Sequence, residues 1–385
     1  MSIREFTNEP VSDEILSTIL WAAYGLREDQ THTVSKIDGT YAAVIYVLNE
    51  EAAYKYDPEQ HRLSVYKEGD HRNDIDILQY NAPIQIGLCW NTSKADANHG
   101  GTELGQIGQN IQFMANALDL GTVVTGQIPP AIEPLGLPEN EEGLIIMPLG
   151  HPKTPYDFKE RPMWISTLPK ITESTSTLSQ TINNHEEGTT FEGQLTDQEV
   201  SQLLWSSYGY SQYIDASEQE PINLKRHRTV PSAHGYYPLV IYALTENGVY
   251  QYYPNILTDI LINTLHIINA PVDFFGLPII TFLKQTVDQD VRNDISVLYE
   301  QPEIASAPLM IIPVLDLEHA KELSIESAKR FWYYEAGAVA HNVMLESTAW
   351  ELTAKIIYAN NPTELRTILQ LTDNNIPTIV IPIGK

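Results

Sequence analysis

The residues 228–238, with the sequence Arg-Thr-Val-Pro-Ser-Ala-His-Gly-Tyr-Tyr-Pro, combine side chains suited to holding a small ligand. Pro231 fixes one backbone angle, Ser232 can hydrogen-bond locally, and Gly235 permits a conformation closed to other residues. Tight loops between regular elements are where small anionic or aromatic ligands are often bound. An apolar strand is predicted to follow at 239–244 and to hold the loop in position.

A basic cluster, Lys-Arg-His-Arg at 225–228, overlaps the start of this loop in an otherwise acidic chain. It suits a bound anion, and it equally suits a solvated loop that balances local acids. His234 and Tyr236 are candidate proton donors, although residues of these types more often only pack. The histidines show no spacing typical of a metal site, and Gly100-Gly101 lacks the Gly-Lys-Ser/Thr of a phosphate-binding loop.

The chain of 385 residues is long enough for two domains that each bury a core. Its 23 Lys and Arg against 50 Asp and Glu give a net charge of -27, which argues against binding to nucleic acid or to an anionic membrane surface. No apolar run approaches the roughly 18 residues of a membrane span, and residues 1–20 carry too many charges for a signal peptide. Cys89 is the only cysteine, so neither an internal disulfide nor a cysteine-based zinc site is expected. We expect a cytoplasmic protein.

An imperfect copy of the loop occurs at 33–41, which keeps Thr, Val and Gly but has lost Pro, the loop Ser and Ala. This copy is one of several segments of the first half of the chain that recur in the same order in the second half. Matching residues lie 242 − 46 = 196 positions apart near the loops and 335 − 103 = 232 positions apart near the central helices. The matched segments are Trp21-Ala22-Ala23-Tyr24-Gly25 with Trp205-Ser206-Ser207-Tyr208-Gly209, Arg72-Asn73-Asp74-Ile75 with Arg292-Asn293-Asp294-Ile295, Glu103, Gly105, Asn110 and Ala117 with Glu335, Gly337, Asn342 and Ala349, and Met147-Pro148-Leu149-Gly150 with Ile381-Pro382-Ile383-Gly384. This many ordered matches indicate the duplication of a whole domain.

Each copy is predicted to alternate helices and strands, with a Tyr-x-Tyr hairpin and a long central helix near 103–118 or 334–350. This mixed order with hairpins favours an α+β fold over a parallel doubly wound sheet. The predicted domains are 1–165 and 191–385, joined by a linker at 166–190 that is rich in Ser, Thr, Asn and Glu. The second copy carries an insertion at about 255–285, which would be either a lid over a site or a contact with another domain or subunit.

Five motifs in one order resemble the nitroreductase family, whose members use FMN. They are Ser2-Ile3-Arg4-Glu5-Phe6, Leu20-Trp21-Ala22-Ala23-Tyr24-Gly25, Arg228-Thr229-Val230-Pro231-Ser232-Ala233, Ala117-Leu118-Asp119-Leu120-Gly121, and Pro148-Leu149-Gly150-His151-Pro152 leading to Arg161. The resemblance covers nearly the whole chain and implies a nitroreductase-like fold in two tandem copies packed as a pseudo-dimer. The Trp-Ala-Ala-Tyr-Gly and Pro-Ser-Ala motifs are most similar to the branch that includes the SagB-like azoline dehydrogenases.

In that family FMN lies between two subunits, so the resemblance implies a composite site between the copies. The residues that it implies are Ser2 and Arg4 toward the ribityl phosphate, Thr125, Gly126 and Gln127 at the flavin edge near N5, Lys159 or Arg161 at the phosphate, and Pro231, Ser232, Ala233 and His234 from the second copy. A dianionic phosphate needs fixed cations, which Arg supplies bidentately, and the ring needs backbone donors. No catalytic acid is assigned.

The opposite composite site is expected to be poor. The second copy has no Ser-x-Arg at its start, has Thr353 at the place of Gly121, and ends at Lys385 before any distal Arg. Its partner loop would be the altered segment 34–37 of the first copy. The first copy itself has Met1 where the family usually has Arg, which removes one phosphate contact. We therefore expect one FMN per chain.

The resemblance thus implies an FMN-dependent oxidoreductase that takes hydride from NAD(P)H or an organic donor and acts on a small-molecule or peptide substrate. A flavin-binding or structural protein with a degraded catalytic site stays open as an alternative. A dehydrogenase of azoline-modified peptides stays open as a third reading, from the branch resemblance alone. The substrate, the nicotinamide preference and any oligomerisation beyond the internal pseudo-dimer are left unassigned.

Overall fold

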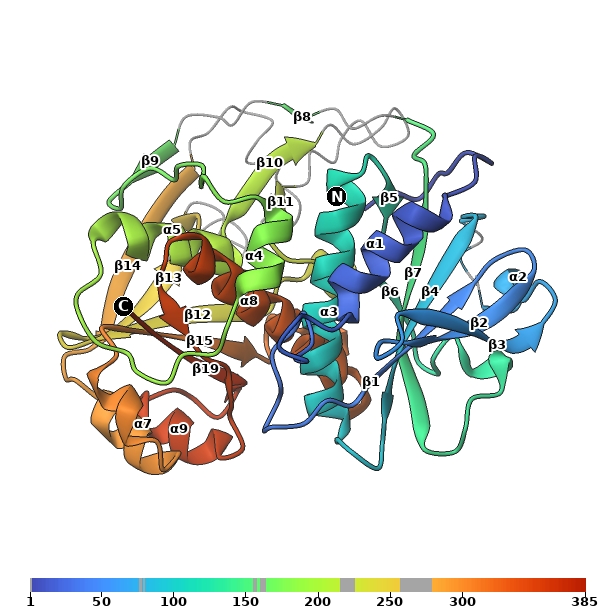
Figure 1. Cartoon of the computed structure of the whole chain (residues 1–385). Coiled ribbons are helices and arrows are strands. Elements are labelled where there is room, and N and C mark those ends of the chain that lie inside the picture. Colours follow the sequence, from blue (N-terminus) through green and yellow to red (C-terminus); the bar gives the residue numbers. More distant parts are fainter. Residues whose placement is uncertain are drawn as a thin grey trace.

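The structure is a computed structural model, and it describes residues 2–75, 78, 80–154, 158–159, 164–214, 226–256 and 279–385. Two large sheets lie on opposite sides of two long helices, α3 (Ala97–Ala117) and α8 (Lys329–Ala349) (Figure 1). The strands of the two sheets pair in the same spatial order. The described chain therefore contains two copies of one arrangement, and the predicted α+β fold is confirmed.

The first copy forms the sheet β3-β2-β1-β4-β7-β5, in which β6 also pairs with β7. Its antiparallel strands carry apolar residues toward helices on one face. The elements of this copy are α1 (Asp13–Tyr24), β1 (Ala43–Leu48), β2 (Ala52–Asp57), β3 (Arg62–Glu68), α2 (Arg72–Ile75), β4 (Ile84–Asn91), α3, β5 (Gly121–Thr122), β6 (Thr125–Gly126) and β7 (Glu141–Gly150).

The second copy repeats this order as β14-β13-β12-β15-β19-β16, with β17 beside β19. A short strand, β18, also pairs with β15. The elements are α5 (Asp197–Tyr208), β12 (Leu239–Thr245), β13 (Gly248–Tyr253), β14 (Ile279–Val287), α7 (Arg292–Leu298), β15 (Leu309–Asp316), α8, β16 (Thr353–Ala354), β17 (Ile357–Tyr358), α9 (Pro362–Ile368), β18 (Asn375–Pro377) and β19 (Ile379–Gly384).

Short strands that follow the first copy lie near the top of Figure 1. β9 (Trp164–Ser166) pairs in parallel with β14 of the second sheet. A small separate sheet has the order β11-β10-β8, from β11 (Arg226–Arg228), β10 (Tyr210–Ile214) and β8 (Phe158–Lys159). This small sheet leads directly into the loop that begins at Thr229.

The first helices of the two copies begin and end in the same way. The Ser12 side chain accepts a hydrogen bond from the Ile15 amide at the start of α1, and Thr196 forms a capping box with Glu199 at the start of α5. Each helix ends at a glycine whose N–H donates to a tryptophan carbonyl 2.7 Å away. These caps confirm the helix starts that the acidic and hydroxyl residues predict.

The two central helices cross at glycines, which lets their backbones approach closely. A Cβ on Gly105 of α3 would lie 2.0 Å from the Tyr334 carbonyl oxygen, and a Cβ on Gly337 of α8 would lie 2.0 Å from that of Thr102. The contacts are reciprocal, because Gly337 is the counterpart of Gly105 and Tyr334 that of Thr102, each at an offset of 232 residues. Both helices are 21 residues long and begin several residues earlier than predicted, at the N-cap Asp96 in the case of α3.

The segment 166–190, predicted to be a linker, contains the helix α4 (Leu178–Asn184), which begins with a Thr177/Gln180 capping box. Its Ile182 is fully buried in the core of the first copy. Of the predicted insertion, residues 257–278 lie outside the described residues. Its end forms β14, which pairs with β13 as β3 pairs with β2.

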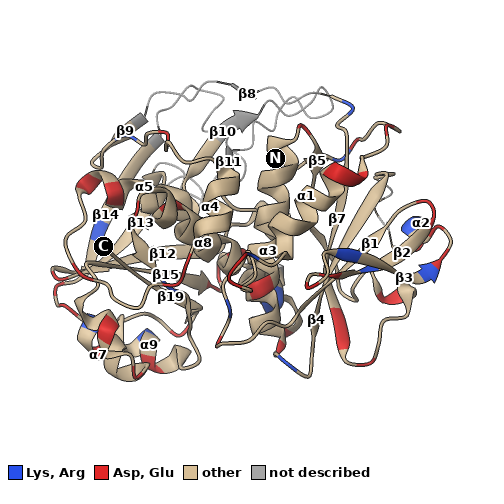
Figure 2. Cartoon of the chain, in the orientation of Figure 1, with Lys and Arg blue, Asp and Glu red and all other residues tan. Residues whose placement is uncertain are grey.

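Acidic positions occur over both copies, in keeping with the net charge of -27 (Figure 2). Within the described ranges, no helix combines the length and the apolar character needed to cross a bilayer. Those ranges also contain no cluster of three or more metal-ligating side chains.

Candidate functional site

The N-terminal segment that carries Ser2 and Arg4 lies along the edge of the first sheet. The Ile3 amide donates to the Thr122 carbonyl of β5 at 3.0 Å, and Ile3 packs over Gly121, where a Cβ would lie 2.6 Å from its side chain. Arg4 is exposed, and no hydrogen bond or ion pair joins it to the described part of the chain. The backbone is thus fixed while the guanidinium stays available.

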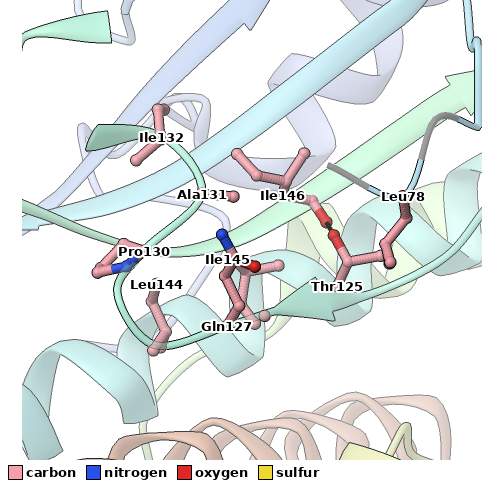
Figure 3. Close-up of a pocket in the computed structure, with 10 residues that line it drawn as sticks. Leu78, Thr125, Gln127, Pro130, Ala131, Ile132, Leu144, Ile145 and Ile146 are labelled. Atoms are coloured by element: carbon pink, nitrogen blue, oxygen red, sulfur yellow. Dashed lines mark hydrogen bonds between the residues drawn. The ribbon is translucent and has the colours of Figure 1, made fainter. Parts of the chain in front are cut away.

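The predicted flavin-edge residues Thr125 and Gly126 form the strand β6, which pairs with the middle of β7. The Thr125 hydroxyl donates to the Ile146 carbonyl at 2.7 Å and is thereby held against the sheet (Figure 3). Gly126 is exposed, and a Cβ added to it would lie 2.5 Å from the ring of Phe331 in the first turn of α8. Gly126 therefore lies at the junction of the two copies.

Gln127 continues this segment along a mostly apolar pocket (Figure 3). The pocket is lined by Leu78, Thr125, Gly126, Gln127, Pro130, Ala131, Ile132, Leu144, Ile145 and Ile146. The side chains of Thr125 and Gln127 supply its polar groups. Leu78 and the neighbouring Ile128 are about half exposed, so the apolar surface continues outward.

The loop of the second copy is anchored to both central helices at its base. The Thr229 carbonyl accepts hydrogen bonds from Gln109 of α3 at 2.8 Å and from Asn342 of α8 at 3.1 Å. Val230 is buried, whereas Pro231, Ser232 and Ala233 are half-buried and His234 is exposed. The base of the loop thus belongs to the junction, and its tip reaches the surface.

The loop tip has an unusual backbone. His234, Gly235 and Tyr237 have φ angles of 53°, 67° and 50°, in the left-handed region that disfavours side chains. The Ser232 hydroxyl oxygen accepts a hydrogen bond from the Tyr237 amide at 2.9 Å and closes the turn. The Ser232 oxygen therefore accepts a hydrogen bond within the loop, while its hydroxyl group keeps a donor.

The two remaining predicted residues, Lys159 and Arg161, lie in and after the strand β8 in the sequence. Lys159 lies in β8, where it pairs with Tyr213 of β10, and its side chain is not described. Arg161 lies outside the described residues. Among the described residues, no hydrogen bond or ion pair links Ser2 or Arg4 directly to the 231–234 loop.

The comparison with known proteins agrees with this geometry. The model of the nitroreductase family matches residues 1–151 and 192–385. The chain belongs to the nitroreductase family. As a member of this family it is an oxidoreductase.

Two relatives of the nitroreductase family extend this finding. The nitroreductase-like protein MJ1384 of Methanocaldococcus jannaschii is 31% identical over 169 residues, which is 39% of this chain and 85% of that protein. The fold of a nitroreductase-like protein from Anabaena variabilis has a TM-score of 0.71 over 98% of this chain and 90% of its own, at 14% identity. A chain of the Escherichia coli microcin synthetase McbBCD has a TM-score of 0.35 at 14% identity over 57% of this chain and 76% of its own, which is too weak to support the azoline-dehydrogenase branch.

The two halves of the chain meet at two related places, here called crossings: one contains the residues described above, and the opposite crossing contains their counterparts. The Gly188 amide donates to the Ala354 carbonyl at 2.7 Å, as Ile3 donates to Thr122 in the first copy. Glu187 and Thr189 therefore take the places of Ser2 and Arg4. Glu187 is exposed, and partial loss of hydration raises the pKa of its carboxyl against the opposing effect of Lys355, Lys36 and Arg27. A carboxyl group thus stands at the equivalent of the implied phosphate end.

The place of Gly126 at this opposite crossing is filled by an aromatic ring. β17 pairs with β19 as β6 pairs with β7, which puts Tyr358 at the position of Gly126. The Tyr358 ring lies 3.8 Å from that of His99, and His99 Nε2 lies 3.1 Å from Asp38 Oδ2. Sequence reasoning missed this replacement, although adding the offset of 232 to Gly126 gives Tyr358.

Proposed function

We propose that the chain is an FMN-dependent oxidoreductase that uses NAD(P)H as reductant and binds one flavin between its copies. The observation that carries the proposal is the asymmetry of the two crossings. The crossing that we assign to the flavin would combine Arg4, the exposed Gly126 and the Pro-Ser-Ala loop, whereas the counterparts of these residues in the other copy are Thr189, Tyr358 and a loop with Lys36. Only the first combines a cation, a surface without a side chain and a tight loop.

The residues at this crossing suit the parts of FMN. Arg4 is an exposed cation with no ion pair among the described residues in a protein of charge -27, which suits a dianionic phosphate. Gly126 is exposed at the junction and has no side chain, so its backbone groups would be accessible to a flavin edge beside the Phe331 ring, which fills the direction of the missing Cβ. The 231–234 loop would face the same ring from the second copy.

FMN bound there would supply two-electron redox chemistry, with hydride coming from the nicotinamide and leaving to a small-molecule or peptide substrate. The protein would contribute binding and orientation. Arg4 and Ser2 would hold the phosphate end, and backbone N–H groups of 125–127 would donate toward the flavin edge. The pocket beside Gln127 would offer an apolar surface to a neighbouring ligand.

The test replaces residues of the proposed site by their counterparts from the opposite crossing, which are Thr for Arg4 and Tyr for Gly126. Arg4→Thr removes a charge-assisted hydrogen bond, for which we expect roughly tenfold to hundredfold weaker FMN binding. Gly126→Tyr introduces a side chain toward Phe331 and is expected to abolish binding. Flavin fluorescence titration of the apoprotein measures both.

The matched control is Thr189→Ala, at the equivalent of Arg4 on the opposite crossing. It should leave FMN binding unchanged, and unchanged binding in Arg4→Thr would contradict the proposal. Anaerobic addition of NADH or NADPH should bleach the visible absorbance of the bound flavin. A flavin that binds at this site and resists both reductants would support the alternative of a flavin-binding or structural protein.

A further inference from the structure

Next to its loop, the second copy encloses a cation in a cage of aromatic rings. The guanidinium carbon of Arg228 lies 4.3 Å from the ring centroid of Tyr208 and 5.0 Å from those of Tyr210 and Tyr237. Its Nη1 donates to the Tyr208 carbonyl at 3.4 Å. Its Nε is buried and has no hydrogen-bond partner in the described chain. The guanidinium is thus held mainly by the faces of the rings.

The first copy has a related cage of two tyrosine rings around an uncharged residue, with Leu26 at the place of Tyr210. At the offset of 196, His32 takes the place of Arg228, and its ring stacks on Tyr24 at 3.9 Å and meets Tyr41 edge-on at 4.3 Å. His32 Nδ1 lies 2.8 Å from the Tyr24 carbonyl, as Arg228 lies near that of Tyr208. Burial lowers the pKa of His32, so the ring is neutral near pH 7. Of the two cages, only that of the second copy therefore encloses a fixed cation.

A buried carboxyl group lies beneath each cage, and its donors differ between the copies. Glu103 accepts a hydrogen bond from the Ala42 amide at 2.8 Å in addition to one from a cage tyrosine. In the second copy Pro238 stands at the place of Ala42 and has no N–H to give. Glu335 therefore lacks this backbone donor. It accepts from the Tyr208 hydroxyl at 2.5 Å.

The other oxygen of Glu335, Oε2, is buried and has no hydrogen-bond partner in the described chain. Burial raises the pKa of the Glu335 carboxyl to about 7, and Ser232, Tyr208 and Arg228 oppose this rise. The hydrogen bond from Tyr208 joins the Glu335 carboxyl group to the cage. The loop joins the same cage through Tyr237, whose ring is one of its walls and whose amide donates to the Ser232 hydroxyl oxygen.

The loop of the second copy needs such an anchor more than its counterpart. His234 and Gly235 match Asp38 and Gly39, which also have positive φ angles. Tyr237 has a φ of 50°, whereas its counterpart Tyr41 is not in this region. Strained backbone persists only where the surroundings determine it. The ring of Tyr237 is one wall of the Arg228 cage.

We propose that Arg228 is a positioning residue, which holds the 231–237 loop in its strained conformation through its cage of tyrosines and the carboxyl group beneath. The role of the loop in flavin binding rests on the function proposed above. The proposal that Arg228 stabilises the loop conformation does not depend on FMN binding. The two claims therefore need separate measurements.

The decisive variant is Arg228→His, which gives the second cage the residue of the first. Hydrogen–deuterium exchange should be at least about tenfold faster at the Tyr237 amide, because the cation–π contacts of the cage are weakened. Arg228→Lys keeps the charge but not the planar guanidinium and should give a smaller acceleration. The affinity for FMN should fall in the same order, by at least about tenfold for Arg228→His.

The matched control is His32→Gln in the first cage, which should leave loop exchange and FMN affinity as in the wild type. Wild-type exchange at Tyr237 in both Arg228 variants would overturn the proposal. An equal acceleration at Tyr237 in His32→Gln would also overturn it, because the effect would then be a general loss of structure. If the wild type binds no FMN, the proposed function fails, and the exchange rates still decide the role of Arg228.

Discussion

Glu103 and Glu335 are carboxyl groups at the same place in the two copies, and only 2% and 1% of each is exposed. Each accepts a hydrogen bond from a tyrosine hydroxyl, Tyr24 or Tyr208. Burial raises the pKa of each carboxyl to about 7, because the charged form loses its hydration. Such groups make stability depend on pH.

The sign of this dependence follows from the direction of the shift. The pKa of Glu103 rises from 4.5 to about 7, so between these values the folded protein holds a proton that the unfolded chain has lost. The free energy of unfolding should therefore fall as the pH rises from about 4.5 to 7 and should level off above this range. Glu103→Gln removes one such carboxyl and should flatten this slope, as measured by urea unfolding at several pH values.

Glu9→Gln is the control for this experiment, because Glu9 is an exposed carboxyl. The control should keep the slope of the wild type. A slope in Glu103→Gln that equals that of the wild type would show that Glu103 is ionised in the folded protein throughout the range.

At the scale of residues, the sequence identifies the 231–234 loop and Gly126, but it does not show which side chains surround them or their counterparts. The match of motifs points to Gly126 and Ser232 directly. The ring of Tyr358 at the opposite crossing and the cages around Arg228 and His32 depend on contacts between residues far apart in the chain. The offsets of 196 and 232 pair these positions in the sequence, but only the structure tells which side chains fill space.

At the scale of elements, the crossing of α3 and α8 sets the distance between the two sheets. Gly105 and Gly337 face the backbone of the opposite helix, where any side chain would collide with a carbonyl oxygen. Gln109 of α3 and Asn342 of α8 bond to each other at 2.9 Å and to the base of the loop. The helix crossing therefore positions the candidate site as well as the core.

Gly105→Ala should separate the helices locally. The new Cβ would lie 2.0 Å from the Tyr334 carbonyl oxygen, and relief of such overpacking costs about 1–3 kcal/mol, more than the gain in helix propensity. Urea unfolding should show this loss, and FMN affinity should fall with it.

Asn116→Ala, at an exposed position of the same helix, serves as the control and should change stability by no more than about 0.5 kcal/mol. A stability of Gly105→Ala equal to that of the wild type would mean that the helices can part without cost.

The sequence predicts the elements well where the periodicity is strong. The paired helix starts, the hairpins and the equal offset of α3 and α8 are confirmed. The early turns of α3 contain Gly100 and Gly101, which disfavour a helix locally, and tertiary packing against Trp90 and Arg330 outweighs this preference. The short helix α4 shows little apolar periodicity in the sequence because only Leu178 and Ile182 of its seven residues pack against the apolar core.

At the scale of the whole molecule, fusion of two copies allows the two crossings to differ, which identical subunits cannot do. Arg330 of the second copy forms an ion pair with Glu142 of the first, beside the crossing that we assign to the flavin. The opposite crossing packs Tyr358 against His99 instead. We therefore propose that one crossing holds the redox site and that the other serves packing.

The number of flavins per chain tests this central claim most directly. Protein purified with excess FMN and freed of unbound flavin should release about one FMN per chain on denaturation, counted by absorbance against protein concentration. We predict one, because Glu187, Lys36 and Tyr358 occupy the opposite crossing. Two FMN per chain would contradict the account by showing that the opposite crossing also binds flavin, and none would contradict the flavin site itself.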